Sequence, residues 1–291
     1  MLSTKHKIKI ARSFNRAIVG ARSIAGRPSR VVVRRRNVTW KLDLNEGIDF
    51  AIYLGLYQRI PQRVTRWIKP GALVLDIGAN IGAHSLLLAQ AVGPHGRVIA
   101  IEPTDYGFSC LKANATLNLD LFQRLILVQA ALTAGAESAD QGGQTQFYSR
   151  WPLNGDDAHR HHKHMGELES AKGARFLGLD TLLAEIRAYG IDQPIAFIKL
   201  DVDGHELDVL RGAAQTLAAQ RPPILIEIAP HVQDEVLGRF EAVLDTLTGH
   251  GYQLETSESG ESLPMSAGAL RTIITDGASI DAIARADEMV K

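Results

Sequence analysis

The sequence has one cysteine, no long apolar run and no acidic residue in its first 42 positions. A single cysteine, Cys110, excludes an intramolecular disulfide and a cysteine-rich metal site, and it fits a reducing compartment. Because no run approaches the length of a membrane-spanning helix and no uninterrupted apolar segment resembles a secretory signal, a cytoplasmic location is expected. The 291 residues, 45% of them hydrophobic, are enough for one large globular domain with extensions.

Charge is unevenly distributed, although the whole chain has a formal net charge of zero. Residues 1–42, called here the basic leader, hold twelve of the 32 Lys and Arg and none of the 32 Asp and Glu. Apolar residues within it recur at three- and four-residue intervals, which predicts an amphipathic basic helix: Ile10, Phe14, Ile18, Ala21 and Ile24.

Such a helix suits contact with an anionic membrane surface, with a partner subunit or with the acidic remainder of the chain. Plain packing and an organelle-targeting role are the alternatives. Nucleic acid is not an expected partner, because the rest of the chain is acidic and the leader has no interleaved aromatic residue beyond Phe14.

Strands and helices alternate after a short hairpin over 30–44 and a helix over 48–68 that Pro61 interrupts. This alternation predicts an α/β fold, with a Rossmann-like, mostly parallel seven-stranded sheet covered by helices on both faces. The last two strands are expected to form an antiparallel hairpin at the sheet edge. The expected strands are 72–77, 97–102, 125–130, 195–201, 223–228, 250–256 and 270–275, and the expected helices are 83–92, 105–118, 179–188, 205–219 and 233–248.

The segment LVLDIGANIGAHS, residues 73–85, is an apolar strand that runs into a glycine-rich turn and then a helix. Glycine lets a ligand approach the backbone, and a helix beginning near Ala83 directs free N–H groups at the turn. The pattern is D-x-G-x-x-x-G, from Asp76 through Gly78 to Gly82, rather than the G-x-G-x-x-G of dinucleotide sites. Asp76 repels a pyrophosphate but accepts hydrogen bonds from an ammonium group, which favours S-adenosylmethionine (SAM).

A second acid supports this interpretation. Glu102, followed by Pro103, ends the second strand 20 residues after Gly82, where a carboxylate binds both ribose hydroxyls of a cofactor. A strand–helix turn without a ligand and a nicotinamide cofactor site are the alternatives.

A second polar cluster follows the apolar strand of FIKLDVDGHE, residues 197–206. Lys199, Asp201 and Asp203 alternate along it and project to one side, and a helix is expected from about His205. Glu227 ends the next strand and is expected to point into the same crevice, because ligands bind beyond the carboxyl ends of strands in such sheets. The structural alternatives are Asp203 as a helix cap and Lys199 in an ion pair with Glu206.

Residues 141–175 interrupt the alternation with a polar, irregular segment. A long insertion beside a cofactor site is often a lid or a substrate-binding segment, and this one contains Phe147, Tyr148 and Trp151. Its four histidines have a spacing that matches no known zinc pattern, so a solvated loop is favoured over a metal site: they are His159, His161, His162 and His164.

Several of these motifs together closely resemble the FkbM-type SAM-dependent methyltransferases. They occur in order between about residues 40 and 275: LDIGANIGAHS, IAIEP, LKANATLN, FIKLDVDGHELDVLRGA and PPILIEI. Asp203 stands where the family's K-x-D-V-E-G-x-E has Glu. The resemblance implies a class I methyltransferase fold over 43–291, with its core at 70–276 and residues 1–42 as an extension. It also implies O-methylation, commonly of hydroxyls on sugars, glycans or polyketide-type metabolites.

Roles can be assigned on this hypothesis. Asp76, Gly78, Asn80 and Gly82 are expected to hold the methionine end of SAM, and Glu102 with Pro103 the ribose. Asp201 or His205 is the candidate general base, and Lys199 is a candidate partner for the acids. A divalent metal held by Asp201, Asp203 and Glu227 is an alternative way to acidify the hydroxyl. An NAD(P)-dependent oxidoreductase and a non-catalytic SAM-fold scaffold are the alternative functions.

Overall fold

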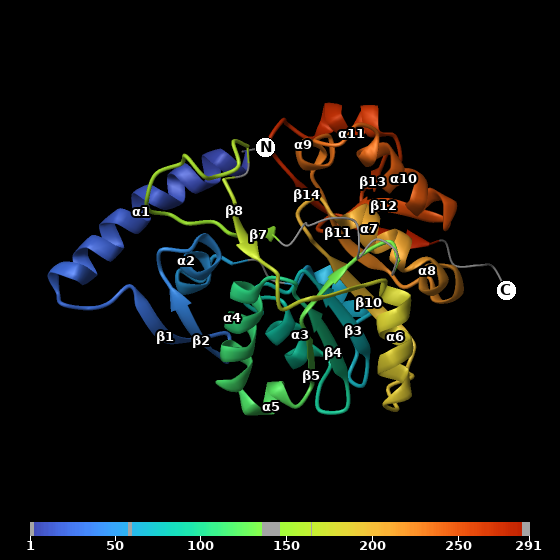
Figure 1. The fold of residues 1–291 in the computed structure, drawn as a ribbon, viewed down its shortest axis with the longest axis horizontal. Helices are drawn as coiled ribbons and strands as arrows, with labels where there is room; N and C mark the ends of the chain where they lie inside the picture. Colours follow the sequence, from blue (N-terminus) through green and yellow to red (C-terminus); the bar gives the residue numbers. More distant parts are fainter. Residues whose placement is uncertain (1–2, 58–59, 136–145, 164, 287–291) are drawn as a thin grey trace.

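A central eight-stranded sheet organises the computed structural model, which describes residues 3–57, 60–135, 146–163 and 165–286 (Figure 1). The five strands from β11 to β5 are parallel, whereas β14, β12 and β13 pair antiparallel. The α/β prediction with a mostly parallel sheet is therefore confirmed, and the two-residue β13 adds an eighth strand at one edge. In spatial order the strands are β13 (Ser262–Leu263), β12 (Tyr252–Thr256), β14 (Ile280–Ala286), β11 (Ile224–Ile228), β10 (Ile195–Leu200), β3 (Leu73–Ile77), β4 (Arg97–Ile101) and β5 (Leu125–Val128).

Helices cover both faces of the sheet because its central strands are apolar on both sides. On β3, Leu75 and Ile77 join one core and Val74 joins the other. The first core includes α6 (Leu179–Ala188), α7 (Glu206–Gly212), α8 (Ala214–Gln220), α10 (Arg239–Gly249) and α11 (Ala267–Ile273). The second includes α2 (Gly47–Tyr53), η1 (Gln62–Arg66), α3 (Ser85–Ala91), α4 (Asp105–Thr116) and α5 (Leu119–Phe122).

The basic leader forms α1 (Thr4–Ile24) and most of a hairpin of β1 (Arg30–Arg35) and β2 (Val38–Asp43), which confirms the helix and hairpin predictions. Arg36 and Asn37 both have positive φ, as a tight two-residue hairpin turn requires. Asn15 of α1 donates to the Leu44 carbonyl at 2.5 Å, and Arg12 binds Asp157 at 2.6 and 3.1 Å. No helix in the described part of the chain is long and apolar enough to cross a membrane.

The predicted final strand was misplaced. Residues 270–275 lie largely in α11, and the strand that enters the sheet is β14, between β11 and β12. The β-branched run at 272–275 indicated a strand, whereas β14 reads IDAIARA and has weak strand propensity. Its burial between two neighbours overrides that propensity. The predicted hairpin of 250–256 with 270–275 is therefore wrong. The strand that pairs antiparallel with β12 at this edge is β14.

Several predicted helices are shorter or divided. The helix expected over 205–219 breaks at Ala213 into α7 and α8, and 233–248 becomes α9 (Pro230–Gln233) and α10, with Gly238 left-handed before α10. The helix expected over 48–68 is reduced to α2 and η1. Similarly, the strand expected over 125–130 ends at Val128, because β6 (Ala130–Leu132) leaves the sheet to pair with β9 (Arg175–Leu177).

The described part of the insertion forms an antiparallel pair, β7 (Gln146–Arg150) with β8 (Glu167–Ser170). Arg150 anchors it: its guanidinium binds Glu46 at 2.5 and 3.0 Å and Glu169 at 3.1 Å, and it lies over the Tyr106 ring. These contacts hold β7 against the end of the sheet where β3, β4 and β10 finish.

Asp49 in α2 gives a pH-dependent test of this packing. Its side chain is 5% exposed and accepts the Asp43 N–H at 2.7 Å, and burial raises the pKa of Asp49 to about 7. In the unfolded chain it ionises near pH 4, so the folded form binds the extra proton and stability falls as pH rises from about 4 to about 7. We expect Asp49→Asn, which keeps the acceptor oxygen, to be more stable than the wild type at pH 8 by about 1–3 kcal/mol and nearly equal at pH 4.

Urea denaturation at both pH values measures this difference. The exposed Asp192→Asn is the matched control and should show no such difference. An Asp49→Asn effect of equal size at both pH values would refute the role given to ionisation.

Candidate active site

The turn after β3 is built by two glycines that protein atoms surround closely. Gly78 and Gly82 have φ of +81° and +88°. A Cβ on Gly78 would lie 1.8 Å from the Asp201 carbonyl oxygen, and one on Gly82 would lie 2.8 Å from a Leu111 methyl. These glycines are therefore required by packing of the turn against β10 and α4, which differs from the ligand-contact reason that the sequence offered. The helix begins at Ser85, two residues later than expected.

Asp76 lies beneath this turn and is completely buried. Ser85 Oγ donates to its Oδ2 at 2.5 Å, and Lys199 Nζ lies 3.5 Å from its Oδ1. Asp76 lines neither of the two cavities described below. Asp76 therefore affects the two cavities indirectly, through its ion pair with Lys199 and through the turn above it.

Lys199 joins the ends of β3 and β10. Its Nζ donates to the Gly78 carbonyl at 3.0 Å and lies 3.3 Å from Asp201 Oδ2, in addition to the Asp76 contact. Burial lowers the pKa of Lys199, but the carboxylates of Asp201 and Asp76 raise it by more, so the pKa is raised overall. The ammonium group therefore stays charged and fixes the orientation of Asp201. The sequence alternative, a pair between Lys199 and Glu206, is not formed; Glu206 instead accepts from the N–H groups of Val202 and Gly204.

Glu102 organises the other side of the turn. Its Oε2 accepts the Asn80 N–H at 2.8 Å, and its Oε1 accepts the Thr104 N–H and hydroxyl at 3.0 and 2.5 Å. Burial raises the pKa of Glu102 despite these bonds. Asn80 also donates to the Ser149 carbonyl at 2.9 Å, which links the turn to β7. Oε1 already accepts two hydrogen bonds from Thr104, so Oε2, which accepts one, keeps an acceptor position for the predicted ribose contact.

A narrow cavity runs along the ends of β3, β4 and β10. Its floor includes Gly78, Asn80, Glu102 and Pro103, together with β6, and its cover comes from the insertion. Phe147 and Tyr148 of β7 supply that cover, in agreement with the predicted position of a lid.

A larger cavity of about 390 Å³ lies on the other side of the turn. Its floor includes Lys199, Asp201, Asp203 and Glu227. Its roof comes from the inner side of α1, and the insertion contributes Trp151 and Leu153. The two cavities share four lining residues, so a ligand in one meets a ligand in the other at the carboxyl end of β10: the shared residues are Gly78, Asn80, Asp201 and Asp203.

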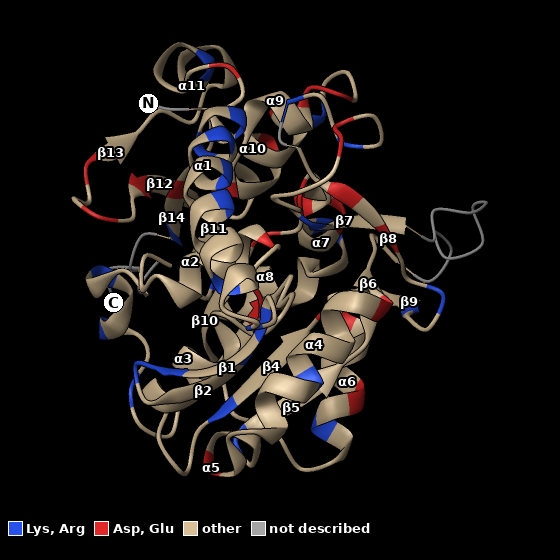
Figure 2. Cartoon of the chain, turned by 90° about the vertical axis from the view of Figure 1, so that its left-hand side faces the viewer, with Lys and Arg blue, Asp and Glu red and all other residues tan. Residues whose placement is uncertain are grey.

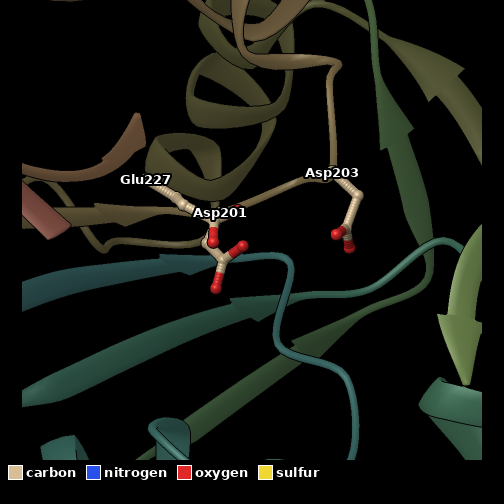
Figure 3. Close-up of side chains that lie close together, drawn as sticks. All are labelled: Asp201, Asp203 and Glu227. Carbon is tan, nitrogen blue, oxygen red and sulfur yellow. The ribbon is translucent and has the colours of Figure 1, made fainter. Parts of the chain in front are cut away.

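Three carboxylates meet at this junction (Figure 3). Asp201 and Asp203 follow β10 and Glu227 lies on β11, and one oxygen of each lies within 4.8 Å of the others. Burial and the Asp201 charge raise the pKa of Asp203 well above its ordinary range and that of Glu227 to about 8. The structure thus brings together the three acids that the sequence grouped.

Asp203 is not a helix cap. α7 begins at Glu206 with His205 at the N-cap position and no side-chain cap bond, and Asp203 adopts a positive φ of 47° that directs the chain around the turn. His205 lines the narrow cavity, with Nδ1 3.6 Å from Asp208 and its ring edge-on to Phe147 at 5.0 Å. Of the two candidate bases, Asp201 lines both cavities and His205 only the narrow one.

The histidines of the insertion occupy different environments. His159 and His162 are exposed, but His161 is buried and its Nε2 lies 2.5 Å from Glu235, so the solvated-loop prediction is wrong at this position. Among the described residues, these histidines form no group of three close enough to bind a metal. His164 lies outside the described residues.

No role was assigned from the sequence to three further polar residues that line the larger cavity, Tyr57, His84 and His231. The rings of His84 and Tyr57 lie 5.4 Å apart there and are tilted to each other. Burial together with Lys199 lowers the pKa of His84 to about 4, so its imidazole is neutral. His231 is 6% exposed, and neither ring nitrogen has a hydrogen-bond partner of normal geometry among the described residues. His84 belongs to the glycine motif itself and His231 follows β11, so their positions after strands were the available signal.

Comparison with known proteins places this geometry in a family. The family model described as the methyltransferase FkbM domain matches residues 76–254, more than half of the chain. The chain belongs to the FkbM methyltransferase family. It is therefore a SAM-dependent methyltransferase, as the glycine motif and Glu102 predicted, and the oxidoreductase alternative is wrong.

Similarity to individual proteins is low. The chain is 25% identical over 215 residues to the AMB antimetabolite synthetase AmbE of Pseudomonas aeruginosa, and the match covers 64% of this chain but only 10% of that synthetase. Among solved structures, a methyltransferase FkbM from Methylobacillus flagellatus KT is 17% identical with a TM-score of 0.41, covering 74% of this chain and 44% of that one. A SAM-dependent O-methyltransferase from Thermotoga maritima is 12% identical with a TM-score of 0.40, covering 92% and 82%.

Lys199 can be tested as the residue that holds the turn together. Lys199→Met removes the buried ammonium and leaves Asp76 without its cationic neighbour, which costs about 3–5 kcal/mol in comparable buried pairs. We expect the free energy of unfolding at pH 7 to fall by that amount, as measured by urea denaturation. Lys112→Met, an exposed lysine on α4, is the control and should change it by no more than about 0.5 kcal/mol. Equal stability of both variants would contradict the role given to Lys199.

Proposed function

We propose that this enzyme transfers the SAM methyl group to a hydroxyl of a small-molecule or glycan acceptor. The observation that carries the proposal is the junction of the two cavities at the carboxyl end of β10, where Asp201 and Asp203 line both. SAM in the narrow cavity, with its ribose at Glu102, directs its methionine end toward the glycine turn. An acceptor in the larger cavity then meets the methyl group beside the acids.

The lining of the larger cavity favours a hydroxylated acceptor. Its three carboxyl groups accept hydrogen bonds from hydroxyl groups, and Asp203 and Glu227, whose pKa values are raised, can also donate one when protonated. Apolar side chains line the roof and walls, among them Ile8, Ile48 and Leu153, and they suit the carbon skeleton of a sugar or a polyketide-type metabolite.

Asp201 is the proposed general base. The acceptor oxygen attacks the methyl carbon, the carbon–sulfur bond breaks, its electron pair stays on sulfur as S-adenosylhomocysteine, and the hydroxyl proton passes to the Asp201 carboxylate. Lys199 holds that carboxylate in place at 3.3 Å, and it is a positioning residue. His205, on the narrow-cavity side, is the alternative base.

A divalent cation fits the same acids. The three ligating oxygens lie within 4.8 Å of one another, and hard carboxylate oxygens are what Mg²⁺ and Mn²⁺ prefer. When bound, such an ion would lower the pKa of a hydroxyl that it contacts.

Asp201→Asn separates catalysis from cofactor binding. We expect methyl transfer to fall by about 10²–10⁴-fold, because the amide cannot accept the proton, with SAM affinity within about tenfold of the wild type. Transfer of a labelled methyl group to a panel of hydroxylated sugars and metabolites measures the first, and isothermal titration with SAM and S-adenosylhomocysteine measures the second.

The exposed Asp245→Asn is the control for this pair of measurements. Wild-type turnover of Asp201→Asn would remove Asp201 as base, and loss of activity on His205→Gln alone would assign the role to His205. Labelling of amines but of no hydroxyl would overturn the O-methylation proposal.

Metal binding is tested with Mn²⁺ itself. After treatment with EDTA, we expect the wild type to bind one Mn²⁺ by electron paramagnetic resonance, Glu227→Gln to bind it at least about tenfold more weakly, and the exposed Glu258→Gln to match the wild type. Absence of Mn²⁺ binding together with full activity in EDTA would exclude the cation and leave the direct-base mechanism.

A further inference from the structure

The outward side of α1 carries an exposed apolar stripe. Of the regularly spaced apolar residues of the leader, Ile18 packs inward, whereas Ile10, Phe14 and Ile24 are 51%, 61% and 92% exposed. Five residues at three- and four-residue steps lie on this side of the helix and are called here the outer stripe: Ile10, Phe14, Ala17, Ala21 and Ile24. At 1.5 Å per residue the outer stripe is about 21 Å long.

Positive charge accompanies the outer stripe. Exposed Lys5, Lys9 and Arg16 lie beside it on α1. On β1, Val32 is 62% exposed, and it shares its face of the strand with the exposed Arg30 and Arg34, so the same combination continues onto the hairpin. Figure 2 shows Lys and Arg along α1 and the hairpin, and α1 itself contains no Asp or Glu.

An apolar stripe flanked by Lys and Arg is the pattern of helices that lie in the plane of an anionic membrane surface. The apolar side chains enter the boundary between headgroups and acyl chains while the cations meet the phosphates. The acidic body of this chain cannot occupy this face, because α1 packs on that body through its opposite side, with Ile8 and Asn15 buried. We propose that the outer stripe and the adjacent face of β1 bind the surface of an anionic lipid bilayer.

The position of α1 connects this surface with the large cavity. Thr4, Lys7, Ile8 and Ala11 line that cavity, while the outer stripe faces away from it. One helix therefore separates the cavity from the proposed membrane surface, which would bring the site close to acceptors held at a bilayer. The docking surface itself stands independently of methyl transfer, so the two proposals fail separately.

Vesicle sedimentation with the 291-residue protein tests the inference. We expect the protein to co-sediment with vesicles of phosphatidylcholine and phosphatidylglycerol, and at least about tenfold more weakly with phosphatidylcholine alone. The double variant Phe14→Ser/Arg16→Glu should bind the anionic vesicles at least about tenfold more weakly than the wild type. Neither residue lines the narrow or the larger cavity, so SAM binding should be unchanged.

A matched control is available on the opposite side of the molecule. Tyr189→Ser/Arg187→Glu removes one exposed aromatic residue and reverses one exposed charge at the end of α6, and it should bind vesicles like the wild type. The proposal would be overturned if Phe14→Ser/Arg16→Glu bound anionic vesicles as tightly as the wild type. It would also be overturned if both double variants lost vesicle binding equally. A stable dimer in sedimentation velocity that the Phe14 variant dissociates without any vesicle binding would overturn it as well, since a second copy would then cover the outer stripe.

Discussion

The ion cluster around Lys199 is the constraint on which the site depends. One buried ammonium holds the Gly78 carbonyl and lies beside the carboxylates of Asp76 and Asp201, so it fixes the ends of β3 and β10 relative to each other. The close approach of the two strand ends leaves no room for a side chain at Gly78. The junction between the two cavities exists because these two turns are held in contact.

A second network does the same for the narrow cavity. Glu102 binds the backbone of Asn80 and Thr104, and both of these residues reach Ser149 of β7, by side-chain contacts at 2.9 and 2.8 Å. The cover of the narrow cavity is thus tied to its floor by hydrogen bonds rather than by apolar packing alone. Hydrogen bonds of this kind contribute about 1 kcal/mol each, so they add a modest restraint to the one that Arg150 supplies.

Much of the fold could be predicted because the sheet is apolar and each strand is bounded by turn residues. The motif residues were also grouped correctly, since parallel strands place their carboxyl ends at one edge. The predictions that failed depended on tertiary contacts. β14 is a strand because two neighbouring strands bury it. His161 is buried beside Glu235, which is 74 positions away in the sequence. The side of α1 that lines the larger cavity was likewise out of reach, because amphipathic spacing does not tell which side of a helix packs.

The origin of the large cavity in separate parts of the chain has an evolutionary consequence. Its floor comes from the sheet, whereas its roof and one wall come from α1 and the insertion, which are joined by the bond between Arg12 and Asp157. Substitutions in the roof leave the residues of the floor unchanged. On the function proposed above, selectivity for the acceptor can therefore diverge in two peripheral segments while the chemistry is inherited unchanged.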